Sequence, residues 1–408
     1  MEDVRADELF ELTTEESGPW RTSDEKRLRD VIKGAEATRE GRLRAVQLTR
    51  SLTGDHTAWP ARLLAAGDLK PDVLVRALIL EGRKVRDRDV ARAARLFQTA
   101  VTLLEPNREL PAEYRALLLG TARVEQANAL RHLGRLREAI GEIDRAEAEL
   151  EGKPACTHEL ARAWLVRGSV LLKMGELTDA LPWLRRAVNL FTAVDDERRV
   201  ARARVVEANV LYELRRIDDA CTLWRSTLPV FAIVRDRKNE AIVWLNLGWC
   251  ALDMDHADEA KDWLERAETR FEKEGSPGEL ARSRWGLALH EARYGARSEG
   301  IARLKRVQDA LSSLSLGLDA AMVYLDIAES FLLPPSRPRE AKALCRRLLP
   351  VFREAGAGRE ALRALAYLAE AARSNRLSPP LLRRVRGDVR QAIIDRSFAY
   401  AAPADEVQ

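Results

Sequence analysis

The sequence is short of the residues that build metal centres and disulfide frameworks. Only four cysteines and five histidines occur among its 408 residues. The cysteines lie far apart and form no CxxC pair, so we expect four small buried side chains in a reducing compartment, not disulfides or a zinc site. The histidines form neither an HExxH motif nor any other paired spacing. We therefore expect no metal ion and no cofactor.

Long apolar runs and catalytic signatures are also missing. No run approaches the roughly 18 apolar residues that a membrane-spanning helix needs. The first residues, MEDVRADELFELTTEE, have neither the basic nor the apolar region of a secretion signal, so we expect a cytoplasmic protein with no membrane contact. The sequence contains no GxxxxGKS/T, GxGxxG or GxSxG motif and no nucleophile with a nearby base. These absences predict that the chain is not an enzyme.

Neither sign of charge dominates the chain. Its 68 basic and 64 acidic residues give a formal net charge of +4, which implies no strongly polyanionic partner. The C-terminal end is basic, with Arg373, Arg376, Arg383, Arg384, Arg386 and Arg390. These arginines could contact nucleic acid, an acidic partner or the acidic N-terminal arm. Because aromatic residues are not interleaved with them, as they are in single-strand binders, nucleic acid is not the expected partner.

One unit occurs three times between residues 159 and 278, at a spacing of 40 residues. Helix-breaking or polar residues recur at Gly175, Arg215 and Asp255, between two columns of alanines. These columns are Ala161, Ala201, Ala241 and Ala281, and Ala180, Ala220 and Ala260. A period of this size is typical of stacked supersecondary units. No alternating strand pattern is present, so we predict an all-α chain.

Within one unit, apolar and small residues follow helical spacing. Trp164, Gly168 and Leu171 share a face of the first helix, and Ala180 and Leu184 share a face of the second. The small residues should let the two helices approach, while Trp164 and Leu184 fill the volume beside them. A single pair cannot cover its own apolar faces, so each pair needs a neighbour.

These columns resemble the tetratricopeptide repeat, whose unit pattern is W-x2-L-G-x2-Y-x8-A-x3-F-x2-A-x4-P. The best matches are Trp164, Gly168, Ala180, Leu184 and Ala187, and Trp244, Gly248, Ala260, Leu264 and Ala267. The resemblance covers about residues 72–390. The spacing of 40 exceeds the usual period of about 34 residues, which predicts longer helices or turns. Such long repeats resemble the sensor domains of bacterial transcription regulators and quorum-peptide-binding proteins. The tyrosine and proline columns are mostly lost.

The resemblance implies a right-handed α-solenoid of stacked antiparallel helix pairs. We predict an acidic arm at residues 1–22, an N-terminal helical extension at 23–71, a solenoid of about seven pairs at 72–376, and a capping helix and tail at 377–408. Ser23 should cap the first helix of the extension. The last helix, basic and weakly apolar, is expected to face solvent.

In the family that the chain resembles, the first helix of each unit lines a concave groove and presents a fixed set of positions to the ligand. The corresponding residues here are Asn128, Arg131, His132, Arg162, Ser169, Lys173, Arg202, Asn209, Tyr212, Glu213, Trp249, Asp253, Arg282, Trp285 and Arg293. A mixed row of polar, charged and aromatic groups suits an extended peptide or a partner's helix. The alternative for each residue is an ordinary solvated face.

The leading hypothesis is therefore a non-enzymatic scaffold or adaptor that binds a protein or peptide in this groove, within a regulatory or multi-protein assembly. The alternative is a peptide-sensing transcriptional regulator. It would contact nucleic acid through the N-terminal helices at residues 24–66 or through the basic C-terminus.

Overall fold

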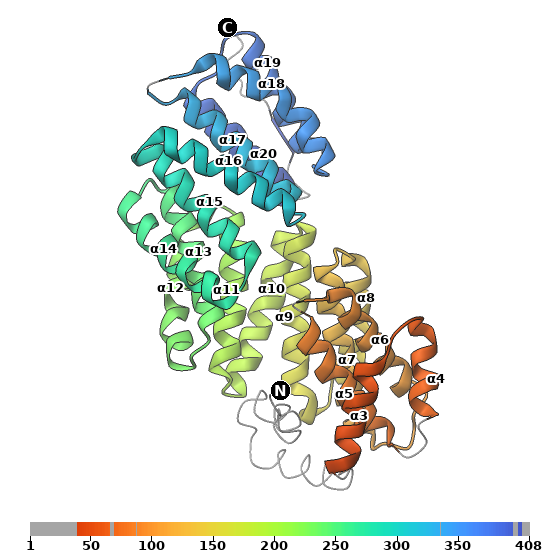
Figure 1. Ribbon diagram of the computed structural model, residues 1–408. Coiled ribbons are helices and arrows are strands. Elements are labelled where there is room, and N and C mark those ends of the chain that lie inside the picture. Colours follow the sequence, from red (N-terminus) through yellow and green to blue (C-terminus); the bar gives the residue numbers. More distant parts are fainter. Residues whose placement is uncertain (1–38, 66–68, 87, 335, 395–398, 402–408) are drawn as a thin grey trace. The chain divides into compact units, whose positions relative to one another are not determined.

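The computed structural model describes residues 39–65, 69–86, 88–334, 336–394 and 399–401 (Figure 1). These residues form helices, turns and loops with no strand, so the prediction of an all-α chain is confirmed. No helix within these ranges combines the length and the apolar character needed to cross a membrane. The acidic arm at residues 1–22 and the predicted cap Ser23 lie outside the described residues.

The helices belong to two compact units. Unit 1 comprises residues 1–173 and 178–206, and unit 2 comprises residues 174–177 and 207–408. Helix α11 (Glu197–Glu213) contributes its first half to unit 1 and its second half to unit 2. The other elements of unit 1 are α3 (Arg39–Ser51), η1 (His56–Ala58), α4 (Trp59–Leu64), α5 (Pro71–Val85), α6 (Val90–Leu104), α7 (Ala112–His132), α8 (Leu136–Leu150), η2 (Pro154–Cys156), α9 (Thr157–Met174) and α10 (Leu177–Ala193). Those of unit 2 are α12 (Ile217–Ile233), α13 (Arg237–Asp253), α14 (Ala257–Glu274), α15 (Pro277–Tyr294), α16 (Arg297–Ser313), α17 (Gly317–Leu332), α18 (Pro338–Glu354), α19 (Arg359–Arg373) and α20 (Pro379–Ile394).

Consecutive helices pair and stack within each unit. Helix α5 packs against α6 and α7 against α8 in unit 1, while α13 packs against α14 and α15 against α16 in unit 2. The first helices of successive pairs begin at residues 157, 197, 237, 277 and 317, so the 40-residue period of the sequence is the period of the structure. Helices of 16 to 18 residues account for the long repeat. We call the surface formed by the first helices of a unit its first-helix face.

The predicted breaker positions are helix ends. Gly175, Arg215 and Asp255 have φ angles of 77°, 63° and 56°, so a single left-handed residue follows each helix. After Asp255, the amide of His256 donates a hydrogen bond back to the carbonyl of Ala251 at 2.9 Å. A left-handed residue followed by this backward bond is the Schellman motif, which satisfies carbonyl groups that the helix end leaves open. The prediction that the repeat is broken at these three residues is confirmed.

Small residues let the helices of a pair come close, as predicted. A Cβ atom at Gly168 would lie 2.5 Å from the side chain of Leu184, and one at Gly248 would lie 2.6 Å from Leu264. Both leucines are fully buried. Trp164, predicted to fill the volume beside them, packs on Trp183 with ring centroids 6.3 Å apart. Each leucine therefore occupies the space that its facing glycine leaves.

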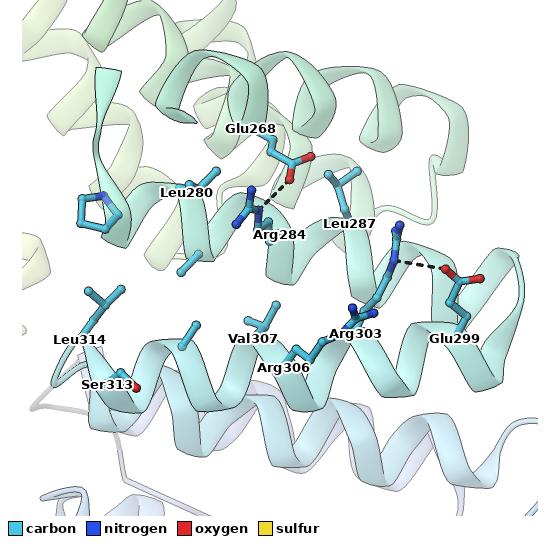
Figure 2. A pocket seen from close by; sticks show the side chains of 13 residues that line it. Glu268, Leu280, Arg284, Leu287, Glu299, Arg303, Arg306, Val307, Ser313 and Leu314 are labelled. Atoms are coloured by element: carbon cyan, nitrogen blue, oxygen red, sulfur yellow. Dashed lines mark hydrogen bonds and ion pairs between the residues drawn. The ribbon is translucent and has the colours of Figure 1, made fainter. Parts of the chain in front are cut away.

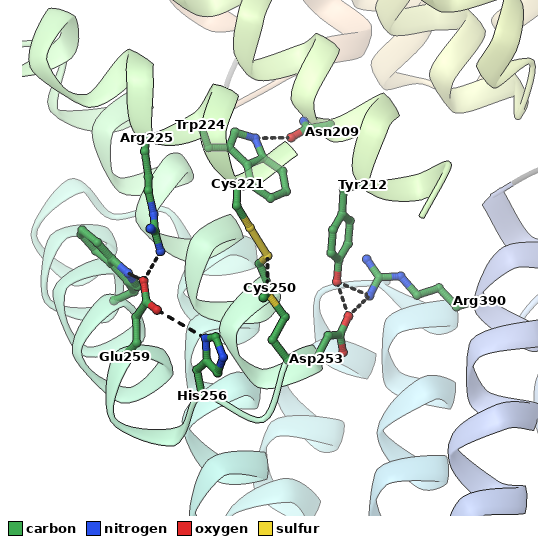
Figure 3. Close-up of a disulfide and its surroundings, with 12 residues drawn as sticks. Asn209, Tyr212, Cys221, Trp224, Arg225, Cys250, Asp253, His256, Glu259 and Arg390 are labelled. Carbon is green, nitrogen blue, oxygen red and sulfur yellow. Dashed lines mark hydrogen bonds and ion pairs between the residues drawn. A yellow bond between two sulfur atoms is a disulfide. The ribbon is translucent and has the colours of Figure 1, made fainter. Parts of the chain in front are cut away.

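Two cysteines are bonded. A disulfide joins Cys221 of α12 to Cys250 of α13 (Figure 3), so the expectation of four free thiols was wrong for this pair. The spacing of 29 residues gave no signal, because the antiparallel packing of the two helices brings the cysteines together. Cys156 and Cys345 are free and buried.

The disulfide predicts a thiol count. In denaturant without reductant, we expect Ellman's reagent to label two of the four cysteines, and all four after reduction. Peptide mapping by mass spectrometry should find Cys221 linked to Cys250. Four reactive thiols before reduction would show that the bond is absent from the purified protein.

The last helix departs from the repeat. Helix α20 packs against α19 and also against α17, the first helix of an earlier pair (Figure 1). Four of its side chains are buried, at Leu381, Leu382, Val385 and Val389. The expectation that this helix faces solvent was therefore wrong. Its apolar residues fall on one helical face, which the sequence-based interpretation underestimated because arginines surround them.

Candidate binding surface

A buried carboxylate joins three first helices of unit 1. Glu125 of α7 accepts hydrogen bonds from Arg83 at 2.7 Å and from Arg86 at 2.9 Å, at the C-terminal end of α5. Arg162 of α9 also donates to Glu125 and forms an ion pair with Glu159. The Glu125 side chain is only 1% exposed. These contacts tie α5, α7 and α9 together across the first-helix face.

The environment of Glu125 keeps it charged at neutral pH. Burial raises the pKa of this carboxyl, but the guanidinium groups of Arg83, Arg162 and Arg86 outweigh it and hold the pKa at about 2. Burial likewise lowers the pKa of Arg162, and Glu159 and Glu125 reverse the effect, so the net direction is upward. Glu125, its arginine partners and Glu159 form a fixed charged network that supports the first-helix face of unit 1.

Four of the predicted binding residues of unit 1 meet at the C-terminal ends of α7 and α9. The side-chain oxygen of Asn128 accepts hydrogen bonds from Nε and Nη2 of Arg131 at 3.1 and 2.9 Å. His132 Nε2 lies 2.8 Å from Arg131 Nη2 and accepts from it, since arginine can only donate. Lys173 Nζ donates to the Arg131 carbonyl at 3.4 Å. We call these four residues the Arg131 cluster.

Among the residues that the structure describes, no carboxylate forms an ion pair with Arg131. Burial lowers the pKa of Arg131, and repulsion from Arg86 lowers it further, to about 10. The guanidinium is half-buried and oriented by Asn128, and its side-chain hydrogen bonds go to an amide and an imidazole, not to a carboxylate. An anionic group from a ligand would relieve the repulsion and complete the hydrogen bonding.

Three further predicted residues, on α9 and α11, do not belong to the Arg131 cluster. Arg162 belongs to the Glu125 network. The Ser169 hydroxyl donates to the Leu165 carbonyl of its own helix at 2.9 Å. Arg202 is half-buried on α11.

In unit 2, an arginine from α20 reaches three of the predicted residues, of which Figure 3 shows Tyr212 and Asp253. Arg390 donates to the Tyr212 hydroxyl at 3.1 Å and to Glu213 at 3.2 Å, and it lies 3.9 Å from Asp253. Its guanidinium also stands over the Tyr212 ring, 4.8 Å from the centroid. The Tyr212 hydroxyl in turn donates to Asp253. Three helices, α11, α13 and α20, therefore meet at one arginine.

Two further arginines of α20 bind carboxylates of α17. Arg386 lies 2.6 Å from Asp326 and Arg383 lies 2.5 Å from Glu329, and both carboxylate side chains are almost fully buried. Two predicted residues, Trp285 and Arg293, bind the same carboxylates: Trp285 Nε1 donates to Asp326 at 2.7 Å, and Arg293 pairs with Glu329 at 3.2 Å. We call Glu213, Asp253, Asp326 and Glu329 the acidic row of unit 2.

The remaining predicted residues of unit 2 hold other side chains. Asn209 accepts hydrogen bonds from Trp224 at 3.1 Å and from Asn246 at 2.9 Å. Trp249 packs edge-on against Trp285, with centroids 4.9 Å apart. Arg282 pairs with Asp319 at 2.7 Å. Their role in binding a partner stays a prediction.

Comparison with known proteins agrees with the helix pairs described above. Residues 161–192 and 241–273 match the family model described as tetratricopeptide repeat. The chain therefore contains tetratricopeptide repeats, at the helix pairs α9–α10 and α13–α14. No protein with a curated description matches it in sequence.

Solved structures share the fold of this repeat protein. Aspartyl phosphate phosphatase F from Bacillus subtilis is 13% identical, with a TM-score of 0.56 over 86% of this chain and 90% of that one. A Rap protein complexed with competence and sporulation factor is 14% identical, with a TM-score of 0.52 over 91% and 99%. The apo quorum sensor NprR from B. thuringiensis is 14% identical, with a TM-score of 0.53 over 90% and 99%. At these identities the likeness is one of fold.

Three carboxylates of the first-helix faces were not predicted from the sequence: Glu125, Asp326 and Glu329. Asp326 and Glu329 lie three residues apart within AAMVYLDIAESFL, a stretch that is otherwise almost wholly apolar. Two acidic residues in such a helix require cationic partners, because a buried charge is costly unless it is paired. That signal was present in the sequence. It predicts cationic partners for the two carboxylates but does not identify the arginines.

A cleft on unit 2 lies apart from the acidic row (Figure 2). It has a volume of about 750 Å³ and lies between α15 and α16, with Glu268 of α14 at its edge. Leu280, Leu287 and Val307 give it apolar walls. It shares no residue with the predicted groove, whose positions on α15 point elsewhere. Within the described ranges, no group of three or more His, Cys, Asp or Glu side chains could hold a metal ion.

Proposed function

We propose that this tetratricopeptide repeat protein is a non-enzymatic adaptor whose unit 1 binds a protein or peptide on its first-helix face. The Arg131 cluster is the contact that selects the ligand, and the ligand presents a carboxylate to it. This carboxylate is either an acidic side chain or a free chain end. The other charged residues of the face, on α5, α7 and α9, form the support that holds the cluster in place.

One observation carries the proposal. Arg131 is oriented by a side-chain oxygen of Asn128, is half-buried and is repelled by Arg86, yet its side-chain hydrogen bonds go to an amide and an imidazole and none goes to a carboxylate. A carboxylate binds a guanidinium through two parallel hydrogen bonds and fits such a site. Repeat proteins of similar fold include one solved with competence and sporulation factor bound, which supports a ligand-binding role.

The test uses the full chain and a defined probe. A library of fluorescent ten-residue peptides, each made with a free and with an amidated C-terminus and with or without internal Asp or Glu, is screened by fluorescence polarisation. Hits are expected to depend on a carboxylate, and Arg131→Ala should weaken them by about 10-fold or more, since a hydrogen bond to a charged group contributes roughly 1.5–3 kcal/mol.

Arg137→Ala is the matched control, because Arg137 is an exposed arginine on α8, a second helix of the same unit. This variant should bind like wild type. Peptides that bind Arg131→Ala as tightly as wild type, or that bind equally well after every carboxylate is removed, would contradict the proposal.

The alternative of a peptide-sensing transcriptional regulator requires a contact with nucleic acid. The fold is shared with the quorum sensor NprR, which is consistent with a sensing role. However, Arg383, Arg386 and Arg390 are engaged by carboxylates of unit 2, which disfavours nucleic-acid contact through α20. Binding of duplex DNA by the full chain that weakens steeply with salt would favour the regulator.

A further inference from the structure

Helix α20 lies where the ligand of a repeat protein would lie in unit 2. Three of its arginines, Arg383, Arg386 and Arg390, bind side chains of α11, α13 and α17, all of which are first helices. An ordinary second helix packs beside its own first helix and the next one. Helix α20 instead packs on α17, the first helix of an earlier pair, and its arginines also reach α13 and α11. A segment of the chain itself therefore occupies this surface.

The fit between α20 and the acidic row is specific in spacing and in residue type. Arg383, Arg386 and Arg390 are separated by three and four residues, which places them on one side of a helix. Arg386 lies 2.6 Å from Asp326 and 4.0 Å from Asp253, so it bridges two repeats. Arg390 uses separate nitrogens for Tyr212 and Glu213 while it stands over the Tyr212 ring. A lysine could not make this set of contacts, because its single nitrogen has no planar fork.

The acidic row needs a cation whether or not α20 is present. Asp326 is fully buried and Glu329 is 1% exposed. Burial raises the pKa of Asp326, and Arg386 and Arg293 oppose that rise. If α20 left, Arg293 would be the remaining guanidinium beside these two carboxylates among the side chains that the structure places there. The surface therefore favours another basic segment as the replacement.

We propose that the first-helix face of unit 2 is a binding site for an amphipathic helix that carries arginines, that α20 is its internal occupant, and that a partner segment of the same chemistry displaces α20. The displacing helix needs three arginines at the spacing of α20 and an apolar stripe beside them. The stripe is required because Leu381, Leu382, Val385 and Val389 are buried and would have to be replaced. This site is separate from the Arg131 cluster of unit 1, so either can fail without the other.

The experiment uses the full chain and a fluorescent peptide of residues 377–394 as the probe. Val385→Asp places a charge in the buried stripe of α20 and should release the helix while the acidic row stays intact. Fluorescence polarisation should show the peptide binding this variant at least 10-fold more tightly than wild type, in which the tethered helix competes at high effective concentration.

Two peptides of the same length serve as controls. A peptide with Arg383, Arg386 and Arg390 replaced by glutamine should lose binding. A peptide with Arg384→Gln should keep it, because Arg384 is exposed and forms no ion pair with the acidic row. Equal binding of all three peptides would show that apolar contact alone holds the segment and would overturn the proposal.

Hydrogen exchange on the wild-type chain covers the case in which Val385→Asp does not fold. A saturating concentration of the probe should increase amide exchange in α20 and leave exchange in α5 and α7 of unit 1 unchanged. Unchanged protection of α20 at every probe concentration, together with no binding to the variant, would show that α20 is a permanent part of unit 2 and would overturn the proposal.

Discussion

Replacing Glu125 by glutamine is expected to destabilise unit 1 by about 3–5 kcal/mol, the usual effect of removing one member of a buried ion pair. Glutamine keeps the shape of the side chain and removes its charge. Arg83 and Arg86 would then lose the carboxylate to which they donate, while Arg162 would keep Glu159. Native-state hydrogen exchange at α5, α7 and α9 measures the loss where it occurs.

Glu138→Gln is the matched control for this prediction. Glu138 pairs with Arg135 on the same chain segment, but its side chain is 56% exposed, so the loss of stability should be small beside that of Glu125→Gln. An equal loss of stability in the two variants, or a Glu125→Gln variant as stable as wild type, would show that the buried network does not hold the first helices together.

The Glu125 network also predicts how unit 1 responds to acid. The folded-state pKa of Glu125 is about 2, below its ordinary value of 4.5. The stabilisation is therefore complete above the ordinary value and is lost as the pH falls toward 2. The melting temperature of the wild type should fall through this range, and the difference between wild type and Glu125→Gln should shrink with it. A difference that is constant from pH 7 to pH 2 would contradict the assignment.

The helix pairs could be predicted from the sequence because their causes are local. The spacing of Trp164, Gly168 and Leu171 is that of one helix face, and a breaker such as Asp255 acts on its own helix end. Columns that repeat every 40 residues multiply these local signals. The long helices, the close approach at Gly168 and the left-handed turns follow directly from them.

The ion pairs could not be predicted, because their partners are distant in the sequence. Arg390 and Glu213 are 177 residues apart, and Arg383 and Glu329 are 54 apart. No period relates such positions, since α20 leaves the repeat and folds back over earlier helices. The family pattern named positions such as Tyr212 as ligand contacts, and the structure places a segment of the chain itself against them.

For the variant Gly300→Ala, the repeat pattern and the structure predict opposite changes in stability. Position 300 belongs to the column of Ala180, Ala220 and Ala260, so the pattern alone predicts that alanine restores the repeat. The structure predicts the opposite. A Cβ at Gly300 would lie 2.3 Å from the backbone nitrogen of Ala292 and 2.5 Å from its Cα.

Backbone atoms cannot move aside as a side chain can, so helices α15 and α16 would have to separate. Overpacking of this kind costs about 1–3 kcal/mol, and a clash with backbone should fall at the upper end or beyond. The first helix of this pair explains the clash. Position 292 lies in the repeat column of Leu172, Tyr212 and Leu252, and it holds alanine where the other three hold large side chains. With a small residue on both helices, the backbones of α15 and α16 come close together at this point.

Two other glycine-to-alanine variants serve as comparisons when the free energy of unfolding is measured by urea denaturation. Gly168→Ala should cost less than Gly300→Ala, because its Cβ would meet the movable side chain of Leu184. Gly141→Ala should stabilise the protein by about 0.5–1 kcal/mol, since nothing lies within 4 Å of the added atom inside α8 and alanine favours the helix. If Gly300→Ala were as stable as Gly141→Ala, the close packing of α15 on α16 would be wrong and the column pattern would be the better guide.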